Sequence, residues 1–207
     1  MKICINTLSL IIVLILSANS LICASEIQIP HTGQNNCYSP EGSVIPCAGT
    51  GQDGDKLAGK LWPKVRYTDN NNGTVSDNLT GLTWLKDANC FGVGSWQQAL
   101  ISTKALIGNN SMCSLNDGSI TGDWRLPNVN ELESLVDVSQ MNPALTRPHP
   151  FTNVQFAPLP AGDKYYWSDT TYAGGTDSAW NVRFNDGFKY VLGKSLIGFV
   201  WPVRGPQ

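Results

Sequence analysis

The chain has 207 residues, of which 42% are hydrophobic and only 14% are charged. This length suffices for one domain with a hydrophobic core, and the low charge is typical of exported proteins, whose surfaces carry many uncharged polar side chains. The formal net charge is −2, without a long run of either sign. Nucleic acids and anionic membranes are therefore not expected partners.

The first residues predict an export signal. Lys2 precedes an apolar run over Leu8–Leu16, and the small residues Ala24 and Ser25 follow. This pattern indicates a secretory signal peptide over residues 1–24. The apolar run is shorter than the ~20 residues that cross a bilayer, and no later run is long enough. We therefore expect a secreted, periplasmic or cell-surface protein with no transmembrane span after signal removal.

The cysteines predict disulfide bonds. Cleavage of the signal also removes Cys23, unless a lipid anchors it, for which the preceding Ile22 is unsuited. Four cysteines then remain, namely Cys37, Cys47, Cys90 and Cys113. Of the three possible connectivities, we expect Cys37–Cys47 and Cys90–Cys113, because each pair closes a compact loop that contributes roughly 2–4 kcal/mol. No pair has C-x-x-C spacing, and neither His31 nor His149 lies next to a pair, so no metal site is expected.

Residues 25–60 predict a loop-rich N-terminal arm, because prolines and glycines are frequent there and apolar periodicity is weak. The arm contains Gly49-x-Gly51-x-x-Gly54, which formally matches the spacing of a dinucleotide-binding loop. Such a loop needs a strand before it and a helix after it, and neither is indicated here. The expected organisation is a signal peptide, a disulfide-stapled arm, and a domain over residues 61–207.

Two short strands at residues 65–69 and 73–76 are predicted around the turn Asn72-Gly73. The oxygen-rich run Asp69–Gly73 also resembles part of a calcium loop, but its glycine comes one residue early and no glutamate follows at the required distance. We favour the hairpin, with calcium binding as the alternative. A further strand is expected at Leu79–Leu85.

Two amphipathic helices are predicted from their capping residues. Ser95 and Gln98 have capping-box spacing, and Gly108 is a suitable stop. Asn128 and Glu131 repeat that spacing in the stretch GDWRLPNVNELESLV, where a proline favours an extended segment before the helix.

This second helix and the tryptophan before it are expected to organise the core. Asp123 and Arg125 flank that tryptophan, and we expect them to tie the turn by a charge-assisted hydrogen bond. The residues to which we assign structural roles are Trp96, Trp124, Arg125, Pro127, Glu131, Leu132 and Trp180.

The C-terminal stretch predicts a sheet, with strands at residues 165–168, 179–185 and 188–192 and a turn at Asp186-Gly187. Alternation along the second strand assigns Trp180, Val182 and Phe184 to the inward face. The opposite face would then display Asn181, Arg183 and Asn185, with Lys189 near Arg183 across the hairpin. Such a cationic, amide-rich patch suits anionic or polyhydroxylated ligands.

Several motifs occur in the order of one known family: TDNNNGTVSDNLTGLTWLKDANC, SWQQA, DWRLPNVNELESL, YYWSDT, AWNVRFNDG and WPVRG. Over about Thr32–Arg204 the chain resembles the DUF1566 family, also called the Lcl C-terminal domain after a bacterial collagen-like adhesin. Parts are also similar to formylglycine-generating-enzyme-like domains. The resemblance implies an α+β, C-type-lectin-like fold, with two helices packed on a twisted, mostly antiparallel sheet. It further implies a bacterial envelope or extracellular protein, and glycan-binding adhesion in at least one member.

The sequence does not predict an enzyme or a cofactor. No cysteine follows Cys113, whereas enzymes of the related family use C-terminal cysteines, and neither G-x-S-x-G nor H-E-x-x-H occurs. Our main hypothesis is a recognition module for acidic or other polysaccharides. Its candidate ligand-binding residues are Trp167, Tyr172, Asn181, Arg183, Asn185, Asp186 and Lys189. The alternatives are a structural or self-associating envelope domain and a formylglycine-generating-enzyme-like enzyme.

Overall fold

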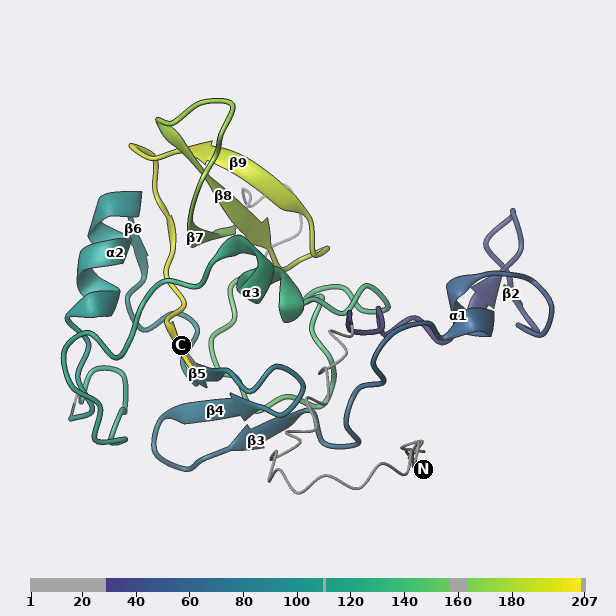
Figure 1. Cartoon of the computed structure of the whole chain (residues 1–207), viewed down its shortest axis with the longest axis horizontal. Coiled ribbons are helices and arrows are strands. Elements are labelled where there is room, and N and C mark those ends of the chain that lie inside the picture. The colour runs from purple at the N-terminus through teal and green to yellow at the C-terminus, as the bar shows by residue number, and fades with distance from the viewer. Residues whose placement is uncertain (1–28, 110, 157–163, 206–207) are drawn as a thin grey trace, which may run out of the picture.

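The computed structural model describes residues 29–109, 111–156 and 164–205, so the predicted signal peptide lies outside the described residues. The chain is a mixed α/β protein in which sheet predominates and the helices are few and short (Figure 1). Both predicted disulfides, Cys37–Cys47 and Cys90–Cys113, are present.

The N-terminal arm projects from the rest of the molecule (Figure 1). It contains the paired strands β1 and β2 and a single helical turn, α1, which the sequence analysis did not predict. The turn forms because Asp55 accepts hydrogen bonds from the backbone N–H groups of Gly49 and Gly51, at 3.2 and 3.0 Å, which folds the glycine-rich loop onto it. The bounds are β1 Cys37–Tyr38, β2 Val44–Ile45 and α1 Asp53–Lys56.

The first sheet of the main body has the order β11-β5-β4-β3 and is antiparallel throughout. The predicted hairpin is confirmed, because Asp69 pairs with Val75 on either side of the turn that contains Gly73. Gly73 has φ +87°, and a Cβ there would lie 2.4 Å from the carbonyl oxygen of Ser114, so only glycine fits. The bounds are β3 Tyr67–Asp69, β4 Thr74–Asp77, β5 Thr83–Leu85 and β11 Val203–Arg204.

The second sheet has the order β6-β10-β7-β8-β9 and is antiparallel except where β10 runs parallel to β7. The last two strands of the chain belong to different sheets and thereby connect them, where the sequence predicted a single sheet. The bounds are β6 Val93–Gly94, β7 Tyr165–Thr171, β8 Ser178–Arg183, β9 Lys189–Gly193 and β10 Gly198–Phe199.

Both predicted helices are present with their predicted caps. Helix α2 spans Trp96–Lys104 and begins with the Ser95–Gln98 capping box, although it ends before Gly108. Helix α3 spans Val129–Ser134 and begins with the capping box of Asn128. Figure 1 places α3 between the two sheets, and its Leu132 is fully buried in a core cluster drawn from both.

Two of the fully buried tryptophans pair their indole N–H groups within the core, whereas the indole N–H of Trp84, which is also fully buried, has no hydrogen-bond partner among the described residues. Trp124 is fully buried and donates its Nε1–H to the hydroxyl of Ser119 at 2.8 Å. Trp201 is also fully buried and donates its Nε1–H to the carbonyl of Leu85 at 2.8 Å. Such pairing removes the cost of burying an indole N–H.

The turn before α3 is tied differently from our expectation. Arg125 makes two hydrogen bonds to the carboxylate of Glu131, at 2.7 and 2.6 Å, rather than bonding Asp123. Asp123 instead accepts the backbone N–H of Ile120 at 2.9 Å. The planar guanidinium matches both carboxylate oxygens, which explains why the more distant acid is the partner.

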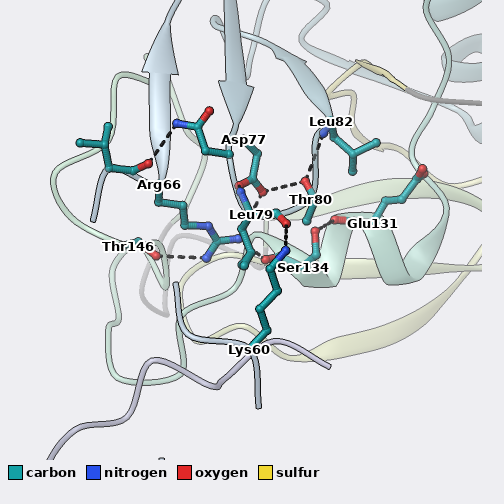
Figure 2. A network of polar contacts seen from close by, with 11 residues as sticks. Lys60, Arg66, Asp77, Leu79, Thr80, Leu82, Glu131, Ser134 and Thr146 are labelled. Carbon is teal, nitrogen blue, oxygen red and sulfur yellow. Dashed lines mark hydrogen bonds and ion pairs between the residues drawn. The ribbon is translucent and has the colours of Figure 1, made fainter. Parts of the chain in front are cut away.

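A buried ion pair joins the first sheet to α3 (Figure 2). Arg66 lies 3.4 Å from Asp77, and it also donates to Thr146 and to the carbonyl of Ser134. Its guanidinium stacks over the indole of Trp62 at 4.4 Å. Arg66 and Asp77 are almost completely inaccessible, so this network holds the root of the arm, β4 and α3 together.

Candidate functional site

The predicted alternation along β8 is wrong at two adjacent residues. Asn181 is fully buried rather than exposed, and Trp180 is partly exposed rather than in the core. The reason is that β8 is an interior strand with both faces covered. Ala179 packs with α2 residues on one face, and Val182 packs in the cluster that contains Leu132 of α3 on the other. A strand covered on both sides loses its simple alternation.

The predicted cationic patch does not form, because its two cations lie on opposite faces. Lys189 is the antiparallel partner of Val182, and paired residues share a face, so Lys189 cannot lie beside Arg183. Arg183 donates to the carboxylate of Asp186 and to the hydroxyl of Tyr190, and its side chain is only 12% exposed. Its guanidinium is thus engaged within the protein.

Two other candidate residues, Trp167 and Asn185, are held by contacts within the protein. Trp167 is fully buried and donates its Nε1–H to the carbonyl of Gly94 at 2.9 Å, so it belongs to the core. Asn185 is half-buried, and its backbone carbonyl accepts the backbone N–H of Asn142 at 2.8 Å. Of the predicted ligand-binding residues, the structure therefore brings Arg183, Asn185 and Asp186 together in one place and Tyr172 and Lys189 in another.

Tyr172 and Lys189 meet around Trp180. The Tyr172 and Trp180 rings lie 5.4 Å apart at 89°, an edge-to-face arrangement. The Lys189 ammonium lies 5.7 Å from the indole centroid and 2.9 Å from the carboxylate of Glu133 on α3. Val191 pairs with Trp180 across the strands and is 38% exposed. We call this surface the Trp180 shelf; its members are Glu133, Tyr172, Trp180, Lys189 and Val191.

The connection from β7 to β8 fixes one end of the shelf. The backbone N–H of Tyr172 donates to Ser178, at 2.9 Å, and Gly175 donates back to Tyr172. A Cβ at Gly174 would lie 2.5 Å from the Tyr172 ring, so the ring rests directly on the glycine backbone. This close approach holds the phenol against Trp180.

Glu133 and Val191 were missed in the sequence analysis. Glu133 lies on the exposed side of a predicted helix, and nothing in the sequence links it to Lys189, which is 56 residues later. Val191 is one of several apolar residues in a predicted strand. Only the pairing of β9 with β8 and the packing of α3 against β8 identify them as members of the surface around Trp180.

Comparison with known families shows the family to which the chain belongs. The sequence matches the family model of the Lcl C-terminal domain over residues 73–204, which is more than half of the chain. The chain belongs to the Lcl C-terminal domain family. The matched part contains the whole Trp180 shelf and begins within the β3–β4 turn, after the N-terminal arm and β3. No curated protein matches the sequence significantly.

In this Lcl C-terminal domain, the electrostatics next to the shelf depend on the start of α3. Burial alone would raise the pKa of Glu131, but hydrogen bonds from Arg125 and from the Asn128 N–H outweigh it and hold the pKa below the ordinary value. Asp169 on β7 shows the opposite behaviour. Burial raises its pKa, and the neighbouring Arg125 offsets only part of that effect.

The oxygen-rich turn Asp69–Gly73, which ends where the family match begins, is tied internally. Asp69 accepts the backbone N–H of Asn71 at 3.0 Å and the ammonium of Lys86 at 2.6 Å, and Asn72 accepts from Thr74. These bonds are those of a closed hairpin turn. Across the described ranges, no group of three or more His, Cys, Asp or Glu side chains is placed to hold a metal ion.

None of the helices in the described part of the chain combines the length and apolar character of a membrane span.

Proposed function

We propose that this protein is an exported, non-catalytic recognition module that binds polysaccharide through the Trp180 shelf. The observation that carries the proposal is the partly exposed indole of Trp180, held at the surface between Tyr172 and the Lys189–Glu133 ion pair. A C-type-lectin-like arrangement of the domain and a location in the bacterial envelope are part of the same proposal. The adhesin after which the family is named supports it.

The chemistry of the shelf suits a sugar. Indole and phenol rings offer apolar surfaces against which the C–H faces of a sugar ring pack, while remaining fixed by their own packing. The Lys189 ammonium donates hydrogen bonds and the Glu133 carboxylate accepts them, so both partners of a sugar hydroxyl are present. A few placed polar groups beside an apolar surface are what orient a bound small ligand.

The charges of the shelf favour a neutral polysaccharide over an acidic one. Lys189 is balanced by Glu133, and Arg183 on the other face is balanced by Asp186. Within the shelf the charge of Lys189 is therefore compensated, which weakens the attraction of an anionic chain. Binding through stacking and hydrogen bonds depends little on ionic strength, because salt screens only interactions between charges.

The test is a panel of neutral and sulfated polysaccharides, measured with the purified protein at low and high salt. We expect saturable binding to a neutral member that changes little with salt. Trp180→Ala and Tyr172→Ala should each weaken it about tenfold, since loss of a stacking contact costs roughly 1.4 kcal/mol. Phe188→Ala removes an exposed aromatic residue outside the shelf and is the matched control.

Circular dichroism and thermal melting establish that each variant is folded. Equal binding by the parent and both folded shelf variants would contradict the proposal. Binding only to sulfated polysaccharides, and lost at high salt, would contradict it as well.

A further inference from the structure

The N-terminal arm is a self-contained unit on a fixed root. Its disulfide Cys37–Cys47 closes the β1–β2 hairpin. The side-chain amide of Gln52 ties the start of α1 to β1, because it bonds both the N–H and the carbonyl of Tyr38, at 2.9 Å each. At the root, the outgoing and returning chains pair, with the N–H of His31 donating to Lys60 at 3.0 Å. The arm thus leaves the body as a preformed projection (Figure 1).

Two adjoining grooves flank that root. Both are bordered by His31 and Trp62, and their volumes are about 420 and 410 Å³. The first runs along α3 to Val138, and the second reaches Leu61 and Arg147. Apolar side chains stand exposed along them: Ile29 is 79% accessible, Leu61 67% and Val138 61%. Large apolar residues gathered in this way at grooves mark an interaction surface.

The arm carries features that complement these grooves. Val44 on β2 is 68% exposed, and Tyr38 beside it is also exposed, so the hairpin displays an apolar tip. Glu41, in the β1–β2 turn, has a pKa lowered by a hydrogen bond with Ser39, so its carboxylate is ionised at neutral pH, whereas the Asp55 carboxylate is already paired with Lys56 at 3.3 Å. Arg147 at the second groove is exposed and positively charged. The arm therefore offers apolar and negatively charged side chains, and the grooves offer apolar side chains and the positively charged Arg147.

We propose that two copies of this chain associate by exchanging their arms, each arm docking into the grooves at the root of the other. The geometry favours the partner's arm as the occupant, because the arm leaves the body at the same residues that border the grooves. A two-fold axis beside that root brings each tip to the partner's grooves in a single self-complementary step. Within one copy the β1–β2 hairpin projects away from the body (Figure 1), whereas the grooves lie at the root, so the tip of the arm does not reach the grooves of its own copy.

The test measures the oligomeric state and the contacts of the full purified protein. Sedimentation equilibrium should give a dimer. Val44→Asp on the arm and Leu61→Asp at the groove should each raise the dimer dissociation constant at least tenfold, because each places a charge in an apolar contact. Ile101→Asp on α2 changes an equally exposed apolar residue on another surface and should leave it unchanged.

A photo-crosslinking residue at position 44 identifies the contact directly. When copies with natural and heavy nitrogen are mixed, crosslinks between the two kinds should join position 44 to the segments around Leu61 and Val138. A protein that stays monomeric at a concentration of about 100 μM would overturn the proposal, because the dimer dissociation constant would then be larger than that concentration. So would a dimer that tolerates both charged variants, or crosslinks that join position 44 to α2.

Discussion

At the scale of single residues, the most consequential contact is the Arg125–Glu131 ion pair. It combines two parallel hydrogen bonds with the capping box, since Glu131 also accepts the Asn128 N–H at 2.8 Å. One carboxylate therefore fixes both the extended segment before α3 and the first turn of the helix. Because α3 carries Glu133, this contact also sets the position of one member of the Trp180 shelf.

The lowered pKa of Glu131 predicts how stability depends on pH. A carboxyl whose pKa is lower in the folded state stabilises the fold above the unfolded value, here 4.5, and this contribution disappears as the pH falls through the folded value. Glu131→Gln should destabilise the protein at pH 7 by about 1 kcal/mol, the size expected for a partly exposed pair. Thermal melts of parent and variant should converge as the pH falls below 4.5 and through the lower pKa of the folded state.

The control for that comparison is Glu133→Gln, on the same helix in the more exposed pair with Lys189. It should change the melting temperature less at pH 7. If the melting difference between the parent and Glu131→Gln stayed constant from pH 7 to pH 3, the role assigned to this ion pair would be wrong.

At the scale of elements, local signals predicted structure well and contacts between distant segments were not predictable. The caps at Ser95 and Asn128 depend on residues three apart, so the sequence alone reveals them. The burial of Asn181 depends on the segments that cover the two faces of β8, and the pairing of Lys189 with Glu133 depends on where α3 packs. Neither is encoded within a short stretch, which is why the predicted ligand-binding face was only partly right.

The β7–β8 connection gives a test of the shelf that leaves its ring residues in place. Gly174→Ala should displace the Tyr172 ring, because the new methyl would lie 2.5 Å from it. We expect weaker binding of the neutral polysaccharide, severalfold, with the melting temperature nearly unchanged because this loop is exposed.

Gly175→Ala is the matched control, since its methyl would meet no atom closer than the Asp177 carboxylate at 3.3 Å. Binding isotherms of both variants with the neutral polysaccharide give the two affinities to be compared. Loss of affinity in Gly175→Ala with full affinity in Gly174→Ala would show that Tyr172 is not held in the way described.

At the scale of the whole molecule, two units with different tasks follow one another along the chain. The Lcl C-terminal domain match covers residues 73–204 and carries the shelf, whereas the arm precedes it and carries the apolar tip. If both proposals hold, arm exchange would place two shelves on one particle. Two linked sites bind a repeating polysaccharide more tightly than either site alone, through the effective concentration of the second site. The mixed α/β character, the disulfides and the family could be predicted from cysteine count and motif order, because these are properties of the chain itself.

The most direct test of the central claim is a nuclear magnetic resonance titration of the indole N–H groups with a neutral oligosaccharide from the panel. Each tryptophan contributes one such signal, and the signals are assigned by single Trp→Phe variants. We expect the Trp180 signal to shift saturably, while those of Trp62 at the grooves and Trp96 on α2 stay in place. A saturable shift of Trp62 or Trp96 with Trp180 unmoved would contradict binding at the Trp180 shelf.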